Sequence, residues 1–319
     1  MAVQLLILVV GLALIVFGAD WLVDGASGIA RKAGISEFVI GLTIVGFGTS
    51  CPELVVSLTG AIAGKSDISA GNVIGSNIFN TLLILGLTAV ISPIAITHEN
   101  KRRDIPMTIA VTLLFILCGM SVSLFGLGDH DGISRTEGAL FLILFAFYIY
   151  RCFKTGSAPG TNEVEEKQLR LAAAIALVAA GLAGLIVGGK LFVNSATEIA
   201  RMAGVSDKFI AVTILAGGTS LPELATCVVA AAKKKGQLAL GNILGSNVFN
   251  ILLVLGCSAA VHPLHFGHIN LVDAGVLMLS ALLVFTSAYT GKKNMLDRLD
   301  GSIMLLCEAA YMTWLIINL

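Results

Sequence analysis

Two glutamates that lie 170 residues apart, Glu53 and Glu223, belong to matching segments rich in small oxygen-bearing side chains. The first segment reads GTSCPEL followed by GNVIGSNIFN, and the second reads GTSLPEL followed by GNILGSNVFN. An ionisable side chain is costly inside a membrane, so its repetition in two apolar stretches indicates a function. Carboxylate, hydroxyl and amide oxygens suit hard cations such as Ca²⁺ better than zinc, copper or iron. The repeated pattern therefore predicts one cation site built from both segments.

The spacing places these oxygen atoms together on helix faces. Thr49 lies four residues before Glu53 and Ser50 lies three before it, so the three share one face of a helix. Ser76 and Asn80 show the same four-residue spacing in the next apolar segment. The second half repeats the set with Thr219, Ser220, Glu223, Ser246 and Asn250.

A proline in each motif predicts a break in its helix. Pro52 and Pro222 lack an amide hydrogen and clash with the carbonyl four residues earlier, so both helices should kink there. The carbonyls of Gly46–Gly48 and Ala216–Gly218 would then lose their helical partners and become available to a cation. Two neighbouring glutamates repel each other unless a divalent ion, sodium ions or protons lie between them. Such a site should not cross the membrane empty, with two uncompensated negative charges. The pattern therefore predicts that one cation is exchanged for another.

The composition is that of an integral membrane protein. Hydrophobic residues make up 56% of the 319-residue chain and charged residues 13%, with a mean hydropathy of +0.93. A soluble domain carries roughly 25% charged residues. The formal net charge is zero, which gives no electrostatic reason to expect a nucleic-acid partner. The apolar runs are continuous rather than alternating, which favours helices over a β-barrel. A membrane-spanning helix needs about 20 apolar residues, and ten runs are long enough: 2–23, 37–61, 69–92, 105–126, 133–152, 169–190, 207–232, 238–261, 269–290 and 298–318.

The repeat divides the chain into two halves of five spans each. We expect the first five-helix repeat over residues 1–150, a cytoplasmic linker over 151–168 and the second repeat over 169–319. Because five is odd, the second half must enter the membrane from the opposite side. The sequence thus predicts an all-α fold of ten transmembrane helices in two inverted five-helix repeats, with helices 2 and 7 broken at GTS-x-PE. Inverted repeats commonly hold a substrate at the midplane between them, which indicates alternating access.

Lysine and arginine placement predicts the orientation. Most of the 20 basic residues fall in the loops after spans 1, 3, 5, 7 and 9. By the positive-inside rule these loops are cytoplasmic, and both termini are extracytoplasmic. Short loops and the lack of an organelle targeting signal favour the inner membrane of a prokaryote.

The paired GTS-x-PEL and GN-x-x-GSN-x-FN segments resemble the two α-repeats of the sodium/calcium exchanger family, in its prokaryotic form, within the cation/calcium antiporter superfamily. The resemblance covers essentially the whole chain and implies antiport of Ca²⁺ against Na⁺ without a cofactor. The ion ligands that it implies are Thr49, Ser50, Glu53, Ser76, Asn80, Thr219, Ser220, Glu223, Ser246 and Asn250, with the carbonyls of Gly46 and Ala216 as additions.

One ligand position varies within this family. Some members, including potassium-dependent ones, carry aspartate where this chain has Asn250. Asparagine there resembles the potassium-independent animal exchangers, so no potassium requirement is expected. The linker 151–168 is too short for the calcium-sensing domain that animal members carry.

Other interpretations stay open at this point. A calcium/proton or other cation/proton antiporter would use the same two glutamates, because protons could replace Na⁺ there. A cation channel would conduct Ca²⁺ with no countertransported ion, although a pore needs no inverted symmetry. Glu53 and Glu223 could instead be protonated structural groups between helices. No hydrolase or protease motif is present, so we expect no enzymatic activity, and the expected partners are Ca²⁺, Na⁺ or H⁺ and membrane lipid, with no obligate protein partner.

Six further acidic residues lie within or near the spans without such oxygen-rich neighbours. We expect helix-end or membrane-interface positions for Asp20, Asp24, Glu137, Glu198, Asp273 and Glu308.

Overall fold

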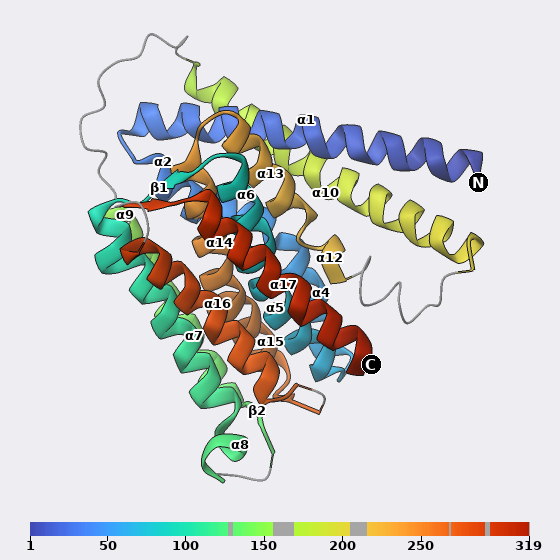
Figure 1. The fold of residues 1–319 in the computed structure, drawn as a ribbon, viewed down its shortest axis with the longest axis vertical. Coiled ribbons are helices and arrows are strands. Elements are labelled where there is room, and N and C mark those ends of the chain that lie inside the picture. The colour runs from blue at the N-terminus through green and yellow to red at the C-terminus, as the bar shows by residue number, and fades with distance from the viewer. Residues whose placement is uncertain (127–129, 156–168, 205–215, 268, 291–293, 319) are drawn as a thin grey trace.

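The computed structural model describes every residue except 127–129, 156–168, 205–215, 268, 291–293 and 319. The described part is a bundle of helices with two short antiparallel strand pairs (Figure 1). The elements of the first half are α1 (Ala2–Ala33), α2 (Glu37–Ile40), α3 (Gly46–Thr49), α4 (Cys51–Ile62), α5 (Ser66–Phe79), α6 (Gly86–Ile91), β1 (Ile94–Ala95), α7 (Ile105–Gly119), α8 (Ser121–Phe125), β2 (Gly132–Ile133) and α9 (Arg135–Thr155), with π-helical turns at Gly41–Val45, Asn80–Leu85 and Asn100–Asp104.

The second half repeats this order closely. Its elements are α10 (Leu171–Met202), α12 (Ala216–Gly218), α13 (Leu221–Ala232), α14 (Gly236–Phe249), a π-helical turn (Asn250–Leu255), α15 (Gly256–Val261), β3 (Leu264–His265), α16 (Leu271–Tyr289), β4 (Met295–Leu296) and α17 (Arg298–Asn318). The strand pairs join the two halves, because β1 pairs with β4 and β2 pairs with β3.

Several of the described helices match the dimensions of a membrane. Seven are long and apolar enough to cross it, and Glu37–Thr49 with Cys51–Ile62, bent by 45°, makes an eighth if the pair is one span. In the two remaining predicted spans, 105–126 and 207–232, the longest described helices are α7, of 15 residues, and α13, of 12 residues. The all-helical fold is thus confirmed, whereas the total of ten transmembrane helices and their inverted arrangement stay predictions.

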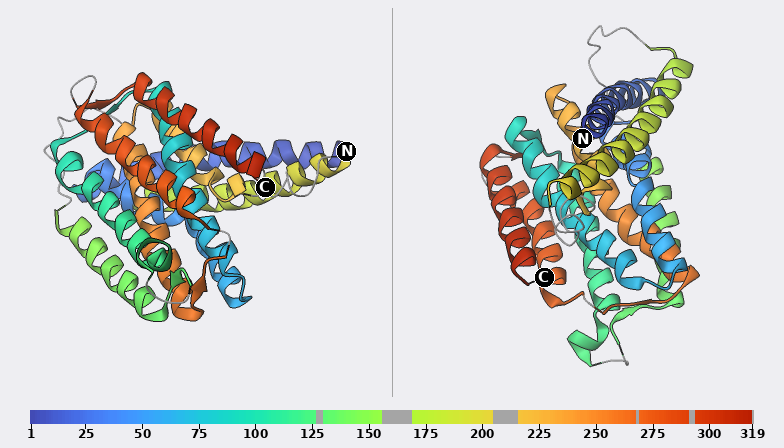
Figure 2. Two further views of the ribbon diagram at one scale, coloured as in Figure 1. Left: turned by 60° about the horizontal axis from the view of Figure 1, so that its bottom comes forward. Right: turned by 90° about the vertical axis from the view of Figure 1, so that its right-hand side faces the viewer.

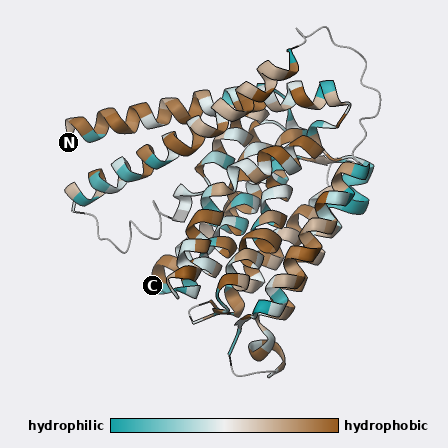
Figure 3. Cartoon of the chain, turned by 180° about the vertical axis from the view of Figure 1, so that it is seen from behind, coloured by the Kyte–Doolittle hydropathy of each residue, from teal (hydrophilic) through white to brown (hydrophobic). Residues whose placement is uncertain are grey.

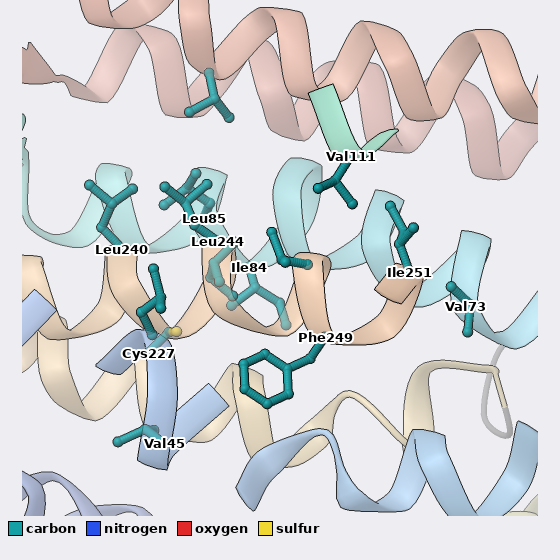
Figure 4. Close-up of a cluster of buried hydrophobic side chains, with 14 of the residues drawn as sticks. Val45, Val73, Ile84, Leu85, Val111, Cys227, Leu240, Leu244, Phe249 and Ile251 are labelled. Atoms are coloured by element: carbon teal, nitrogen blue, oxygen red, sulfur yellow. The ribbon is translucent and has the colours of Figure 1, made fainter. Parts of the chain in front are cut away.

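The centre of the bundle consists of two helical rods, α5–α6 and α14–α15, each continuous through its π-helical turn. In the most apolar stretch of each rod, 67% and 94% of the residues are buried, against 22% for α1 and 17% for α17. Figure 4 shows apolar side chains of the rods packed together, among them Ile84 and Leu244. The two rods also carry Ser76, Asn80 and their counterparts, so the core of the fold coincides with the predicted ion-binding segments.

Helices α1 and α10 lie side by side and extend beyond the rest of the bundle (Figures 1 and 2). Glycines let their backbones approach, since a Cβ atom at Gly18 would lie 2.8 Å from the Leu185 nitrogen and one at Gly188 would lie 2.8 Å from the Gly11 oxygen. Figure 3 shows apolar residues along most of α1. This pair therefore offers its outer surfaces to lipid.

An ion-pair cluster ties α1 to the end of α13. Lys233 Nζ lies 2.7 Å from Asp20 Oδ1 and 2.7 Å from Asp24 Oδ1. Partial burial alone would lower the pKa of Lys233, but hydrogen bonds to the two carboxylates outweigh it and raise the pKa. Asp20 and Asp24 are about half-exposed and lie within α1, and their position at the membrane interface stays a prediction.

Candidate functional site

Both motif helices break at the serine of GTS, as the prolines predict. Ser50 has φ −84° and ψ 4°, and it separates α3 from α4. Ser220 has φ −88° and ψ 7° directly before α13. Each break puts a glutamate, Glu53 or Glu223, in the first turn of the helix that follows. A helix N-terminus carries partial positive charge, so this position favours a carboxylate.

The predicted release of the Gly46 carbonyl is wrong. Its oxygen still accepts the Ser50 amide at 3.1 Å, because the clash with Pro52 falls on a later carbonyl. Ser246 Oγ also lies 3.5 Å from this oxygen, so the carbonyl faces the second half of the site. Ala216, the corresponding residue, is the first residue of α12.

The two glutamates lie where the halves of the protein meet. Both are 0% exposed. Ser220 Oγ donates to Glu53 Oε1 at 3.2 Å, and Ser50 Oγ donates to Glu223 Oε1 at 3.1 Å. Each carboxylate is therefore held by the serine of the other half. Ser246 adds a longer contact of 3.4 Å to Glu223 Oε1.

Five predicted ligand residues have a buried oxygen atom with no hydrogen-bond partner among the residues that the structure describes. These atoms are Glu53 Oε2, Glu223 Oε2, Ser76 Oγ, Asn80 Oδ1 and Asn250 Oδ1, and they make up half of all such side-chain atoms in that part of the chain. A buried polar atom without a partner costs roughly 1–3 kcal/mol. A bound cation would supply the missing partner to all five, so the residues fit a hard cation.

The neighbouring asparagines orient these ligands. Asn80 Nδ2 donates to Asn247 Oδ1 at 3.3 Å, and Asn250 Nδ2 donates to Asn77 Oδ1 at 3.0 Å. Because the amide nitrogens are occupied in this way, the Oδ1 atoms of Asn80 and Asn250 stay free. Asn77 and Asn247 were not predicted as part of the site, although their recurrence in GSN was a usable signal.

Two further asparagines, Asn72 and Asn242, each contact a threonine of the other half. Thr49 Oγ1 lies 3.2 Å from Asn242 Oδ1, and Thr219 Oγ1 lies 3.4 Å from Asn72 Oδ1. Thr49 Oγ1 also lies 3.0 Å from the Val45 carbonyl, a common contact for a helical threonine. The lone pairs of the threonine oxygens remain available to a cation while the hydroxyl hydrogens are donated elsewhere.

Close backbone packing brings the first motif helix onto α14. A Cβ atom at Gly41 would lie 3.1 Å from the Asn242 nitrogen, and one at Gly46 would lie 3.2 Å from the Ser246 nitrogen. At Gly41 a Cβ atom would also overlap the Leu238 carbonyl oxygen, so glycine is needed there for this approach. The GxxxG spacing of Gly241 and Gly245 thus places Asn242 and Ser246 beside the helix break.

The chemistry of the site differs from that of a transition-metal centre. In the described ranges, no group of three or more His, Cys, Asp and Glu side chains could hold a metal ion. The site has two carboxylates surrounded by hydroxyl and amide oxygens, and this set favours hard cations.

Known proteins that resemble this chain are named as transporters or exchangers of hard cations, in keeping with these oxygen ligands. The family model described as "Sodium/calcium exchanger protein" matches residues 3–154 and 173–317. The chain belongs to the sodium/calcium exchanger family. As a member, it is an integral membrane transporter of the cation/calcium antiporter type, and its named relatives are not enzymes.

Relatives of this exchanger-family chain match over nearly its full length. It is 40% identical to the "Putative antiporter CaxA" of Alkalimonas amylolytica, with 98% of each chain covered. It is 32% identical to the "Sodium/calcium exchanger MaX1" of Methanosarcina acetivorans, with 97% of each covered. The solved structure of the sodium-calcium exchanger NCX_Mj, soaked with 10 mM Na⁺ and zero Ca²⁺, matches with a TM-score of 0.86 at 33% identity, covering 98% of this chain and 99% of the other.

One acidic residue contradicts its predicted position. Glu308 was expected at a helix end or interface, but it lies in the middle of α17 and is only 3% exposed. Helix α17 packs against α6 and the π-helical turn Asn80–Leu85, so a residue in its middle can be buried by the bundle. By contrast, Asp273 lies in the first turn of α16, where its carboxylate accepts the Asn270 amide.

Proposed function

We propose that this protein is a secondary active antiporter that exchanges Na⁺ for Ca²⁺ at the site around Glu53 and Glu223. The observation that carries the proposal is the set of five unpartnered buried oxygens, which belong to residues of both halves that hydrogen bonds join to one another. Two buried carboxylates provide two negative charges, which one Ca²⁺ neutralises. Sodium ions accept the same oxygen ligands with less charge each, so they can replace Ca²⁺ at this site.

The proposed mechanism is alternating access. The pair of carboxylates repels itself when no cation is bound, so crossing the membrane in the empty state is unfavourable. The ion-loaded site can instead open first to one side of the membrane and then to the other. The matching contacts that Ser50 and Ser220 make across the halves support two equivalent arrangements of the site.

Calcium-45 uptake into proteoliposomes tests the function. Vesicles loaded with Na⁺ and diluted into sodium-free medium should take up Ca²⁺, and vesicles with an outward proton gradient alone should not. Uptake that only the proton gradient drives would change the coupling ion and leave the site assignment in place. Uptake with neither gradient would indicate a channel and overturn the antiport proposal.

The membrane arrangement belongs to the same proposal. We infer ten transmembrane helices in two inverted repeats, 1–150 and 169–319, joined by the cytoplasmic linker 151–168, most of which lies outside the described residues. The basic residues of the odd-numbered loops put both termini on the extracytoplasmic side of an inner membrane. Labelling of single cysteines, introduced near each terminus, with a membrane-impermeant maleimide on intact cells tests this orientation.

Asn250→Asp is expected to alter the cation preference of the site. Its Oδ1 atom is one of the five unpartnered oxygens, so aspartate would add a third negative charge next to the ions. The added charge favours an additional monovalent cation, and we expect exchange to become sensitive to K⁺ or to require more Na⁺. Calcium uptake with Na⁺ alone and with Na⁺ plus K⁺ measures this. The counterpart Asn80→Asp serves as a comparison, and an unchanged ion profile for Asn250→Asp would show that this position does not set selectivity.

A further inference from the structure

Glu308 is a buried carboxylate that the exchange site does not use. It is 3% exposed, and its Oε2 atom has no hydrogen-bond partner in the part of the chain that the structure describes. No ion pair joins it to a basic residue among those described residues. A buried charge in a membrane protein without a partner is strongly unfavourable, so such a group is expected to bind a cation or a proton.

A large cavity connects Glu308 to the exchange site. The cavity has a volume of about 1380 Å³, and its lining includes Glu308, Ser76, Thr219, Asp273 and Tyr311. Ser76 is only 2% exposed, and its Oγ atom is also unpartnered among the described residues. Two helices, α5 and α17, therefore each contribute a buried oxygen without a partner to one cavity. A cavity of this size has room for water that completes the coordination of an ion.

The other acidic group near Glu308 is already occupied. Asp273 Oδ1 accepts the Tyr311 hydroxyl at 2.9 Å, and its Oδ2 accepts the Asn270 amide at 3.0 Å. Tyr311 stands three residues after Glu308 on the same helix and thus on nearly the same face. Asp67 and Lys190 also line the cavity, and Asp67 accepts the Gly267 amide. Glu308 is the lining carboxylate that has a buried oxygen without a partner among the described residues, and it supplies one negative charge. One charge matches a monovalent cation better than a divalent one.

The corresponding place in the first half contains an aromatic residue. Gly138 of α9 and Gly301 of α17 make equivalent close contacts, with Gly256 and Gly86 respectively, which are 170 residues apart. Seven residues further along each helix stand Phe145 and Glu308. The Phe145 ring packs against the Phe249 ring at 4.9 Å between centroids. Of these two equivalent positions, only that of the second half carries a carboxylate. The apolar contact of Phe145 indicates that packing at such a position does not require one.

We propose that Glu308 forms a binding site for a monovalent hard cation, Na⁺, in this cavity, which Ser76 of the exchange site also lines. The assignment to Na⁺ rests on the proposed function. Glu308 binds the ion directly, while Asp273 and Tyr311 add polar groups to a lining that is otherwise mostly apolar. Because Phe145 takes the equivalent position in the first half, the carboxylate of this site comes from the second half. Sodium held there lies in the cavity that Ser76 and Thr219 of the exchange site also line.

The sodium dependence of exchange by Glu308→Gln tests the proposal. We expect the half-saturating Na⁺ concentration for sodium-driven calcium uptake to rise about three- to tenfold. Calcium–calcium exchange, measured without Na⁺, should remain at the wild-type level because Glu53 and Glu223 are intact. The matched control is Glu99→Gln, which changes an exposed carboxylate outside the cavity and should alter neither quantity. Glu308→Asp keeps the charge and should stay closer to wild type than Glu308→Gln.

A second variant and a direct binding measurement keep the proposal testable if Glu308→Gln does not fold or if the protein shows no exchange. If Glu308→Gln does not fold, Glu308→Phe supplies a second charge-free variant with the residue that the first half carries. If wild-type protein shows no sodium/calcium exchange, the proposed function fails, and thermal unfolding of purified protein in NaCl against choline chloride still tests sodium binding. Smaller stabilisation of the charge-free variants by Na⁺ supports the site. Equal stabilisation, an unchanged sodium dependence, or a change in pH dependence alone overturns it.

Discussion

Glu53→Gln and Glu223→Gln are each expected to abolish calcium uptake while the protein still folds. Glutamine keeps the size of the side chain and retains an oxygen that can accept the serine hydroxyl of the other half. It removes one of the two charges that neutralise Ca²⁺. Removing one member of a buried charged interaction costs on the order of 3 kcal/mol, or about a hundredfold in affinity. Calcium-45 uptake at fixed external Ca²⁺ measures the loss.

The same substitution at Glu99 provides the control for these two variants. Glu99 is exposed, so Glu99→Gln should transport calcium at the wild-type rate. Size-exclusion chromatography and thermal unfolding in detergent establish that each variant is folded. Wild-type calcium uptake by either Glu53→Gln or Glu223→Gln would remove these residues from the ion site. A variant that loses transport through misfolding would show it in the unfolding curve.

The sequence predicted the helix breaks and the positions of the site because both have local causes. A proline acts on the backbone within four residues, so the breaks could be placed from the motif alone. The predicted common helix face of Thr49 and Glu53 is wrong, because Thr49 ends α3 and Glu53 lies in the first turn of α4, beyond the break at Ser50. The 170-residue repeat then paired the two halves without any knowledge of the fold. The Gly46 carbonyl stays bonded to the Ser50 amide because the residue four before Pro52 is Gly48, so the rule for proline never applied to Gly46.

Contacts between helices that are far apart in the chain could not be predicted from the sequence. The pairing of Ser50 with Glu223 depends on how α4 and α13 meet, which no spacing within one helix reveals. The burial of Glu308 depends on the rotation of α17, which the close contact of Gly301 with Gly86 determines. An acidic residue in an apolar run looks the same in sequence whether its face meets lipid or the core. Its role therefore became visible only from the packing.

Gly241→Ala is expected to destabilise the protein and to impair transport. A Cβ atom there would overlap the Phe38 carbonyl oxygen and lie 2.9 Å from the Leu42 nitrogen. Both contacts are backbone atoms of the first motif helix, so no side-chain rotation can relieve them. Overpacking of this kind costs about 1–3 kcal/mol in the free energy of unfolding. The helices must separate, which also moves Asn242 away from Thr49.

Gly275→Ala separates this packing effect from the general effect of alanine in a helix. Gly275 is an exposed residue of α16, and a Cβ atom there would meet no described atom within 4 Å. Alanine favours a helix more than glycine does, so this control should be as stable as wild type or slightly more stable. Thermal unfolding in detergent and calcium-45 uptake compare the two variants. If Gly241→Ala unfolds and transports like Gly275→Ala, the close approach of α14 to the first motif helix is not what holds the ion site together.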